Sequence, residues 1–289
     1  MKTLEKHTVN PIRTLEKFTM VYDSDCPLCM AYTSAFINSK MLDKEGRIPY
    51  QQVGGNFCPE MDAERAKNQI ALVNRETGKV HYGLDSLLLV TGFRYPVLGK
   101  IVRLQPLNFV VEQLYSFISY NRKVIIPAPK SNASTFDCTP TFNLKYRVAY
   151  IIFTWIITSI VLVNYSTLLL GVIPKTNFYR EFLICGGQVL FQAIALTLVT
   201  RSKHWDYLGN MMTVSLIGAI LLLPALVVGF TFAAIPPVVF LAYFMLVVGV
   251  MLHAHARRMK VLELGWWPSA SWVLYRLMVL FIVIYPNVN

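Results

Sequence analysis

Acidic residues are scarce in this chain. Its 289 residues include 16 Asp and Glu against 27 Lys and Arg, which gives a formal net charge of +11. No known nucleic-acid-binding motif and no groove pattern of aromatic and basic residues accompanies that charge, so we expect no nucleic acid partner. Many basic residues flank apolar segments, where anionic lipid headgroups are the simpler partner; these are Arg122, Lys123, Lys130, Lys145 and Arg147.

Cysteine is also infrequent, and the sequence predicts no secretory leader. Five cysteines with only one close pair do not make a disulfide scaffold. The first twenty residues contain no apolar core of the length that a signal peptide requires, so we expect the N-terminal domain to stay in the compartment where it is made. In a reducing compartment Cys26 and Cys29 rest as thiols. We expect Cys138 and Cys185 to be ordinary residues, and Cys58 too, although it could join the redox chemistry.

Long apolar runs dominate the second half of the chain, whereas the first half carries most of the charge. The split predicts an integral membrane protein with an N-terminal extension (1–14), an α/β domain (15–129), a linker (130–147) and a membrane domain (148–289). Five apolar segments each approach the ~20 residues that a crossing requires. They predict an all-α transmembrane helical bundle, with spans at 148–171, 181–200, 207–230, 234–253 and 269–286.

Basic residues lie mostly on one side of these predicted spans. Lys and Arg favour cytoplasmic loops, so this side is expected to be cytoplasmic, as in a bacterial-type inner membrane. The N-terminal domain then faces the cytoplasm, whether or not the fifth segment crosses. The basic side carries Lys145, Arg147, Arg201, Lys203, Arg257, Arg258 and Lys260, and the other side carries Lys175 and Arg180.

Polar residues inside the predicted spans mark packing or function. Gln188 and Gln192 are four apart and share a helix face, which favours an inter-helix contact. Arg276 is the candidate for an intramembrane function, or else it pairs with an acceptor or extends to the interface. A metal site could join His204, Asp206, His253 and His255, but a His-x-His helix turns its two rings to different faces. An interfacial belt is the simpler interpretation, so we expect no metal and no cofactor.

The most informative motif is the pair Cys26 and Cys29, in the segment Tyr-Asp-Ser-Asp-Cys-Pro-Leu-Cys at 22–29. The apolar pattern predicts a strand at 17–22 and a helix from Pro27 to about residue 40. A helix N-terminus stabilises a thiolate and lowers its pKa. Two cysteines three residues apart share one helix face and can close a small disulfide. The pair therefore has the geometry that thiol–disulfide exchange needs, with one attacking and one resolving thiol.

The acidic residues beside the pair have two interpretations. Asp23 or Asp25 could accept the proton of Cys29 during exchange. Asp25 could instead cap the helix N-terminus, which we favour for that residue. A nearby carboxylate also raises a thiol pKa, which opposes the helix dipole. We expect Tyr22 to be a packing residue.

The segment at 22–29 resembles the signature of the DCC family of thiol–disulfide oxidoreductases, although Ser24 replaces the usual glycine. Two later segments also resemble that family: 81–87, which contains Gly83, and 115–122, which ends in Asn121 and Arg122. The resemblance covers roughly residues 15 to 129. It implies a thioredoxin-like fold, a catalytic set of Cys26, Cys29 and Asp23, and supporting roles for Tyr22, Pro27, Gly83, Asn121 and Arg122.

The order of predicted elements agrees with such a fold. Segment 48–53 follows as a second strand, 59–67 as a short helix, and 69–74 with 79–82 as a hairpin. Helices are expected at 84–92, 96–104 and 107–121. Thioredoxin-like reductases usually carry a cis-proline just before the hairpin, but 66–69 contains no proline. Either substrate binds differently, or generic protein disulfides are not processed.

These observations favour a membrane-anchored thiol–disulfide oxidoreductase that faces the cytoplasm and acts on a protein partner or disulfide substrate at the membrane. One alternative is a non-enzymatic binding module in which the pair holds a soft metal such as Zn²⁺ or Cu(I), with Asp23, Cys58 or another chain completing the site. Another is a structural subunit of a membrane assembly with a vestigial cysteine pair. The sequence names neither substrate nor electron donor.

Overall fold

The computed structural model describes residues 14–53, 58–128, 138–174, 177–198, 203–232 and 235–284. The chain forms two compact units. The first, an α/β unit, contains the described residues up to Arg122 and those of Ala128–Phe142; the second, a helical unit, contains Lys123–Pro127 and the described residues from Asn143 on. Expectations for the extension at 1–13, and for Lys130, Lys175 and Arg201, lie outside the described residues.

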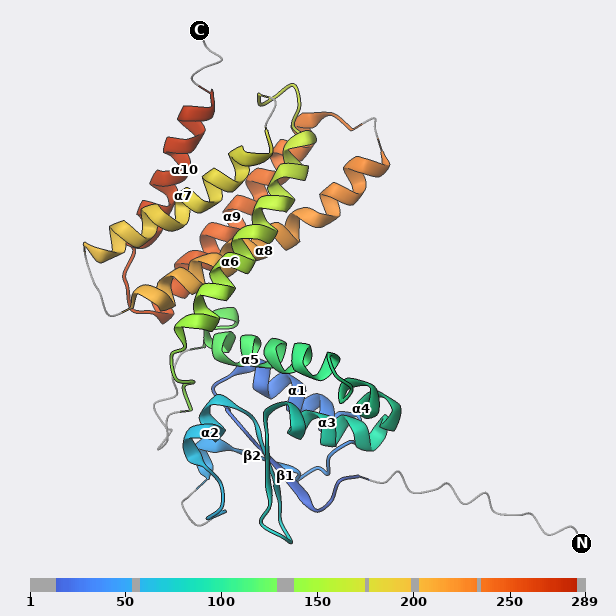
Figure 1. Ribbon diagram of the computed structural model, residues 1–289. Helices are drawn as coiled ribbons and strands as arrows, with labels where there is room; N and C mark the ends of the chain where they lie inside the picture. The colour runs from blue at the N-terminus through green and yellow to red at the C-terminus, as the bar shows by residue number, and fades with distance from the viewer. Residues whose placement is uncertain are drawn as a thin grey trace, which may run out of the picture. The chain divides into compact units, whose positions relative to one another are not determined.

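Four strands form a mixed sheet in the α/β unit (Figure 1). They are β1 (Phe18–Tyr22), β2 (Arg47–Pro49), β3 (Ala71–Asn74) and β4 (Val80–Tyr82), in the order β2-β1-β3-β4. Strand β1 runs parallel to β2 and antiparallel to β3, with Met20 opposite Leu72. Strands β3 and β4 form the expected antiparallel hairpin. The predicted second strand is shorter than expected, because a 3₁₀ turn (Tyr50–Gln52) follows Pro49.

Side chains alternate across the central strands and build two apolar clusters. Met20 and Leu72 pack with helices α1 (Pro27–Asn38), α3 (Gly83–Arg94) and α5 (Leu107–Ile125), whereas Val21 and Val73 pack with α2 (Ala63–Asn68). Figure 1 shows α1, α3 and α5 together over one face of the sheet. The end of β1 and the start of α1, where the cysteine pair lies, are thus held by a buried strand and a packed helix.

Large apolar side chains are exposed along α4 (Pro96–Val102) and the first turns of α5. We call this surface the α4–α5 ridge; its exposed members are Tyr95, Val97, Leu98, Ile101, Leu104, Leu107, Phe109, Val110, Leu114 and Ile118. Contiguous exposed apolar surface of this kind marks an interaction or membrane-contact site in natural proteins. The α/β unit therefore has an exposed apolar surface in addition to its charged residues.

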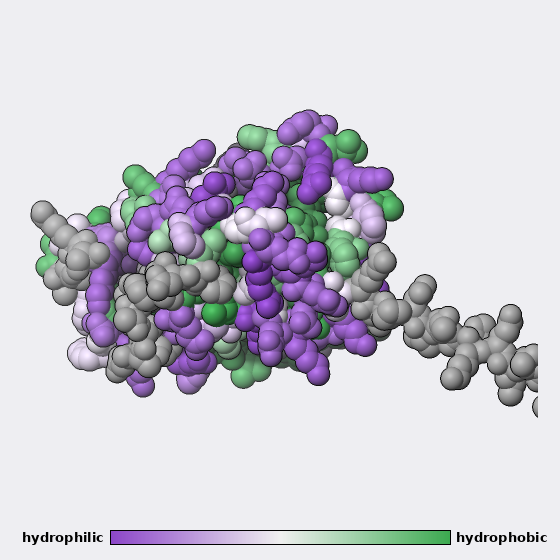
Figure 2. All heavy atoms as spheres, turned by 90° about the horizontal axis from the view of Figure 1, so that it is seen from below, coloured by the Kyte–Doolittle hydropathy of each residue, from purple (hydrophilic) through white to green (hydrophobic). Residues whose placement is uncertain are grey.

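The described residues from Asn143 on form five helices, at the positions of the five predicted spans. They are α6 (Leu144–Thr167), α7 (Phe178–Thr197), α8 (His204–Thr231), α9 (Pro237–Val261) and α10 (Trp267–Ile284). By length and composition, α6, α8 and α9 can each cross a membrane, and α10 is a shorter apolar helix. Many large apolar side chains on these helices are exposed. Figure 2 shows the molecule from below, and hydrophilic residues cover most of the face seen in that view.

Polar side chains meet at one end of the helical unit. Arg147 of α6 donates to Asp206 of α8 at 3.0 Å, and Arg258 of α9 donates to the Asn210 side chain at 2.8 Å and to the Val124 carbonyl at 2.7 Å. Both arginines are buried. The expectation that Arg147 meets lipid headgroups is therefore wrong, because Arg147 is buried and forms an ion pair with Asp206.

Candidate functional site: the cysteine pair

Cys26 itself is the N-cap of α1. Its backbone is extended, Pro27 takes the first helical position, and Cys26 Sγ accepts a hydrogen bond from the Cys29 backbone N–H at 3.4 Å. The favoured assignment of Asp25 as the cap is therefore wrong. A sulfur in this position meets the unpaired N–H groups and the positive end of the helix dipole directly.

The loop between β1 and α1 is fixed by Asp23 and Gln51. Asp23 Oδ1 accepts hydrogen bonds from the Asp25 backbone N–H at 3.0 Å and from Gln51 Nε2 at 2.8 Å. Gln51 Oε1 accepts from the Ser24 backbone and hydroxyl at 3.1 and 2.9 Å. Gln51 thus holds Asp23 and Ser24, and Asp23 in turn holds the backbone of Asp25. Nothing in the sequence marked it, because it comes from the turn after β2.

Arg122 places a buried positive charge beside the pair. Its guanidinium donates to the carbonyls of Lys67 at 2.7 Å and Cys138 at 2.9 Å, and lies 3.7 Å from Asp23 Oδ2. The side chain is only 6 % exposed. The expectation that Arg122 meets lipid headgroups is wrong, because its guanidinium is buried in the α/β unit and bonded to groups of that unit. Its neighbour Asn121 is fully buried and donates to the Phe117 carbonyl, which fixes this turn of α5.

The two thiols have very different acidities. The pKa of Cys26 is lowered to about 6, chiefly by the hydrogen bond from the Cys29 side chain; the Cys29 backbone N–H and Arg122 add to the effect, while burial and Asp23 oppose it. The pKa of Cys29 is raised well above its ordinary value by the same hydrogen bond and by burial. Near neutral pH the pair therefore holds one thiolate at Cys26 and one thiol at Cys29.

The backbone of Ile70, just before β3, is fully engaged within the unit. Its N–H donates to the Tyr115 hydroxyl at 2.9 Å, and its carbonyl accepts from the Gly83 N–H at 2.9 Å and the Ser86 hydroxyl at 3.4 Å. Gly83 has a φ of +61°, and a Cβ there would lie 3.0 Å from Gln69 Oε1. Gly83 thus permits the tight turn from β4 into α3 beside this backbone.

Access to the sulfurs is restricted. Cys26 is 1 % exposed and Cys29 6 % exposed, although Pro27 and Met30 beside them are exposed. All five cysteines are free thiols. Tyr22 packs its ring under the Arg47 guanidinium at 5.2 Å, in agreement with a packing role. The described residues contain no group of three His, Cys, Asp or Glu side chains that could hold a metal ion.

The remaining candidates lie apart from the pair, in the helical unit. Arg276 stacks on the Trp272 ring, with 3.9 Å between guanidinium carbon and ring centroid. His255 is buried against Trp272, whereas His253 is exposed, so these two rings do point to different faces. No family model, curated protein or solved structure matches this chain. The function of the chain has therefore to be inferred from the geometry of the cysteine pair.

Proposed function

We propose that the protein is a membrane-anchored thiol–disulfide oxidoreductase whose reactive pair is Cys26 and Cys29. The observation that carries this proposal is the asymmetry of the pair. One sulfur caps a helix beside a buried arginine and has a pKa of about 6, and the other is a protonated thiol. Exchange requires this division of roles, because the thiolate attacks and the second thiol resolves.

The reaction balances as a two-electron transfer. The Cys26 thiolate attacks a substrate disulfide, forms a mixed disulfide and releases one substrate thiolate. Cys29 then loses its proton and attacks Cys26 Sγ, which releases the second substrate thiolate and leaves Cys26 and Cys29 joined. A dithiol reductant returns the pair to the reduced state by the same steps in reverse order.

Arg122 and Asp23 have opposite effects on the pKa of Cys26. The guanidinium favours the thiolate and stays charged, whereas the carboxylate raises the pKa of Cys26. The buried carboxylate offsets the cost of the buried cation, so the ion pair holds Arg122 near both sulfurs. Asp23 remains the candidate acceptor of the Cys29 proton within this proposal.

The low exposure of both sulfurs restricts the substrate. A protein disulfide can reach Cys26 only after a local opening at the exposed residues Pro27 and Met30. The engaged backbone of Ile70 offers no free donor or acceptor for an extended peptide. These two features favour a dedicated partner at the membrane over generic protein disulfides.

The fold and membrane placement form part of the same proposal. The order β2-β1-β3-β4, with a parallel β1–β2 pair and a β3–β4 hairpin, is what a thioredoxin-like domain of the DCC family would have. We extend the three membrane-crossing candidates to five spans, α6–α10, with the α/β unit in the cytoplasm. Lys145, Lys203, Arg257 and Lys260 support this orientation from the ends of α6, α8 and α9.

A redox titration of the full chain in native membranes tests the function. The background variant Cys58→Ser/Cys138→Ser/Cys185→Ser leaves only the pair to report, by the mass shift of thiol alkylation. A reversible two-electron transition near the cytosolic thiol poise, roughly −220 to −320 mV, is the expected result. The further change Cys26→Ser/Cys29→Ser is the control and must abolish it.

A second function is favoured by one observation, the burial of both sulfurs. A structural or metal-holding pair needs no access, so both of its thiols would resist oxidation, and Cys26 would resist alkylation, in the titration. That outcome would overturn the proposal that the protein is an oxidoreductase. Loss of bound Zn²⁺ or Cu(I) on Cys26→Ser/Cys29→Ser, measured by elemental analysis, then separates a metal-holding pair from a vestigial one.

A further inference from the structure

The helical unit contains a cavity of about 460 Å³, to which all five helices contribute side chains. Most of its lining is apolar, with Leu162 and Leu169 from α6, Leu222 from α8, and Phe244 and Met251 from α9. The volume is in the range of sites that hold a molecule of drug or lipid size. An apolar space of this size within a helical bundle suits the tail of a lipid.

Two buried polar groups in the cavity wall have no hydrogen-bond partner among the described residues. They are Gln188 Nε2 on α7 and Thr158 Oγ1 on α6, and their side chains are 5 % and 6 % exposed. Buried polar groups are almost always paired, because an unpaired one costs about 1–3 kcal/mol in hydrogen-bonding terms. Both groups can donate, so a ligand with acceptor atoms would satisfy them.

Arg276 of α10 supplies a positive charge to the same wall. Its guanidinium lies over the Trp272 ring, its Nε has no hydrogen-bond partner, and no carboxylate of the described residues is within ion-pair distance. Glu181, which also lines the cavity, is already paired with Arg180 at 2.7 Å. Arg276 is in the middle of α10, about 12 Å from either helix end, which is farther than its side chain reaches. A buried positive charge inside a membrane-spanning helix is costly unless an anion pairs with it.

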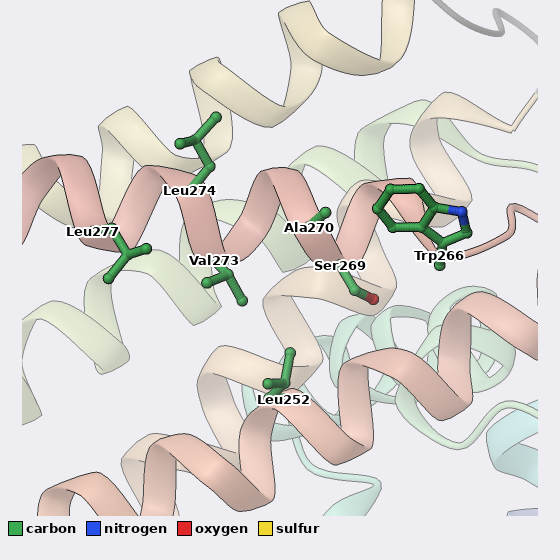
Figure 3. Close-up of a pocket in the computed structure, with 7 residues that line it drawn as sticks. All are labelled: Leu252, Trp266, Ser269, Ala270, Val273, Leu274 and Leu277. Atoms are coloured by element: carbon green, nitrogen blue, oxygen red, sulfur yellow. The ribbon is translucent and has the colours of Figure 1, made fainter.

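An apolar groove between α9 and α10 adjoins this cavity (Figure 3). Leu252, Val273 and Leu277 line both spaces. In Figure 3, Val273 of α10 and Leu252 of α9 point toward one another, and Trp266 stands at the start of α10. The groove opens at the surface, where its lining residue Trp266 is 79 % exposed. A hydrocarbon chain can therefore leave the cavity between these two helices.

We propose that this cavity binds a lipid anion, with its carboxylate or phosphate head at Arg276 and Gln188 and its hydrocarbon tail along the α9–α10 groove. The head accepts hydrogen bonds from Gln188 Nε2 and the Thr158 hydroxyl and neutralises Arg276. This site is independent of the cysteine chemistry, because it uses other residues and another unit of the chain.

Quenching of tryptophan fluorescence by brominated lipids tests this site, because Trp272 lines the cavity. The full chain in dodecyl maltoside at pH 8 is titrated with 9,10-dibromostearate and with the uncharged 9,10-dibromostearyl alcohol. The acid is expected to bind at least about tenfold more tightly, since a hydrogen bond to a charged group is worth a factor of that size. A lysophosphatidate with the same brominated chain shows whether a phosphate head binds more tightly than a carboxylate.

Variants connect the quenching to the named residues. Arg276→Gln should raise the Kd for dibromostearate about tenfold and leave the Kd for the alcohol unchanged. Gln188→Leu should raise the Kd for dibromostearate about tenfold and the Kd for the alcohol less, because a hydrogen bond to a charged acceptor is stronger than one to a hydroxyl. Arg257→Gln is the matched control, because it removes an arginine of α9 that does not line the cavity. Equal Kd values for acid and alcohol, or an unchanged Kd in Arg276→Gln, overturn the proposal. If Arg276→Gln does not elute as a folded protein in size-exclusion chromatography, the Kd values of Gln188→Leu and Arg276→Lys test the proposal instead.

Discussion

At the scale of single residues, the cysteine pair depends on groups that lie far away in the sequence. Arg122 is near both sulfurs because α5 packs against the sheet, and Asp23 meets it at 3.7 Å. This cation lowers the pKa of Cys26, although by less than the hydrogen bond from the Cys29 side chain does. The acidity of Cys26 is therefore a property of the folded α/β unit.

Alkylation of the reduced protein should distinguish the two thiols. The Cys26 thiolate forms as the pH rises through about 6, so its rate of modification by iodoacetamide should reach half its maximum near pH 6. Cys29 should remain unmodified at pH 8. Peptide mass spectrometry across pH 4–9 measures both rates, and a Cys26 midpoint above pH 8 would contradict the structure. Cys29→Ser changes the main hydrogen bond to Cys26 and should raise the midpoint.

The same acidity predicts a pH dependence of stability. The pKa of Cys26 is lowered from 9.0 to about 6 by folding. The folded state therefore gains stability as the pH rises from 6 to 9 and loses it as the pH falls through 6. The raised pKa of Cys29 has the opposite effect above pH 9. Thermal unfolding of the reduced protein in detergent should show a Tm that rises between pH 6 and 9, and Cys26→Ser should remove part of that rise.

Arg122→Gln should raise the pKa of Cys26, because it removes the only positive side chain among the causes of the lowered value. The expected change is a shift of the alkylation midpoint to higher pH, with a loss of about 3–5 kcal/mol of stability because Asp23 stays buried without its partner cation. Arg103→Gln, an exposed arginine after α4, is the matched control. Equal midpoints in the two variants would exclude an electrostatic role for Arg122.

The sequence predicted part of this site. The spacing of Cys26 and Cys29 before an apolar helix was enough to place them at its N-terminus. The cap was assigned to Asp25 because a carboxylate is the usual capping group, but the Cys26 sulfur takes that position. The contacts of Arg122 and Gln51 could not be predicted, because they depend on packing between segments far apart in the chain.

At the scale of elements, the hairpin and the helices after it were predicted within a few residues, since glycine and proline residues mark their turns. The second strand was predicted to reach residue 53, but it ends at Pro49. Proline has no N–H to continue the ladder, so the chain turns there. The helix predicted from residue 59 begins at Ala63, where the Asp62 side chain caps it by accepting from the Arg65 N–H.

Gly83→Ala should destabilise the protein by about 1–3 kcal/mol. The substitution forces a non-glycine residue into a positive φ and brings its Cβ within 3.0 Å of Gln69 and 3.3 Å of the Tyr115 ring. Gly92→Ala is the control in the same helix, because its Cβ would lie 3.7 Å from Gly99 and alanine favours a helix interior. Denaturation of both variants measures the difference, and equal stability would show that the α3 turn tolerates a side chain.

At the scale of the whole molecule, the uneven charge distribution predicted an α/β domain and a membrane domain joined by a linker, and the contact pattern divides the chain into an α/β unit and a helical unit. The predicted linker begins later than the observed boundary, because Lys123–Pro127 at the end of α5 already belongs to the helical unit. The carbonyls of Val124 and Ile125 accept from Arg258 at 2.7 and 3.0 Å, which explains that membership. Such contacts have no local sequence pattern.

Membrane topology can be measured directly. With five crossings, a reporter after residue 289 should lie on the opposite side of the membrane from a reporter at the N-terminus. Fusions to alkaline phosphatase and to a green fluorescent protein, made at both ends and in the α8–α9 connection, give the pattern. Both ends on one side would mean that an even number of helices crosses and would correct the five-span proposal.

The α4–α5 ridge has a practical consequence for anyone who works with this protein. A fragment that ends at Phe142 would retain the sheet, the cysteine pair and Arg122, but it would also retain ten exposed apolar side chains. We therefore expect that removal of the helical unit would not yield a freely water-soluble fragment. The fragment would need detergent during purification, and a measurement in plain buffer would report on aggregates.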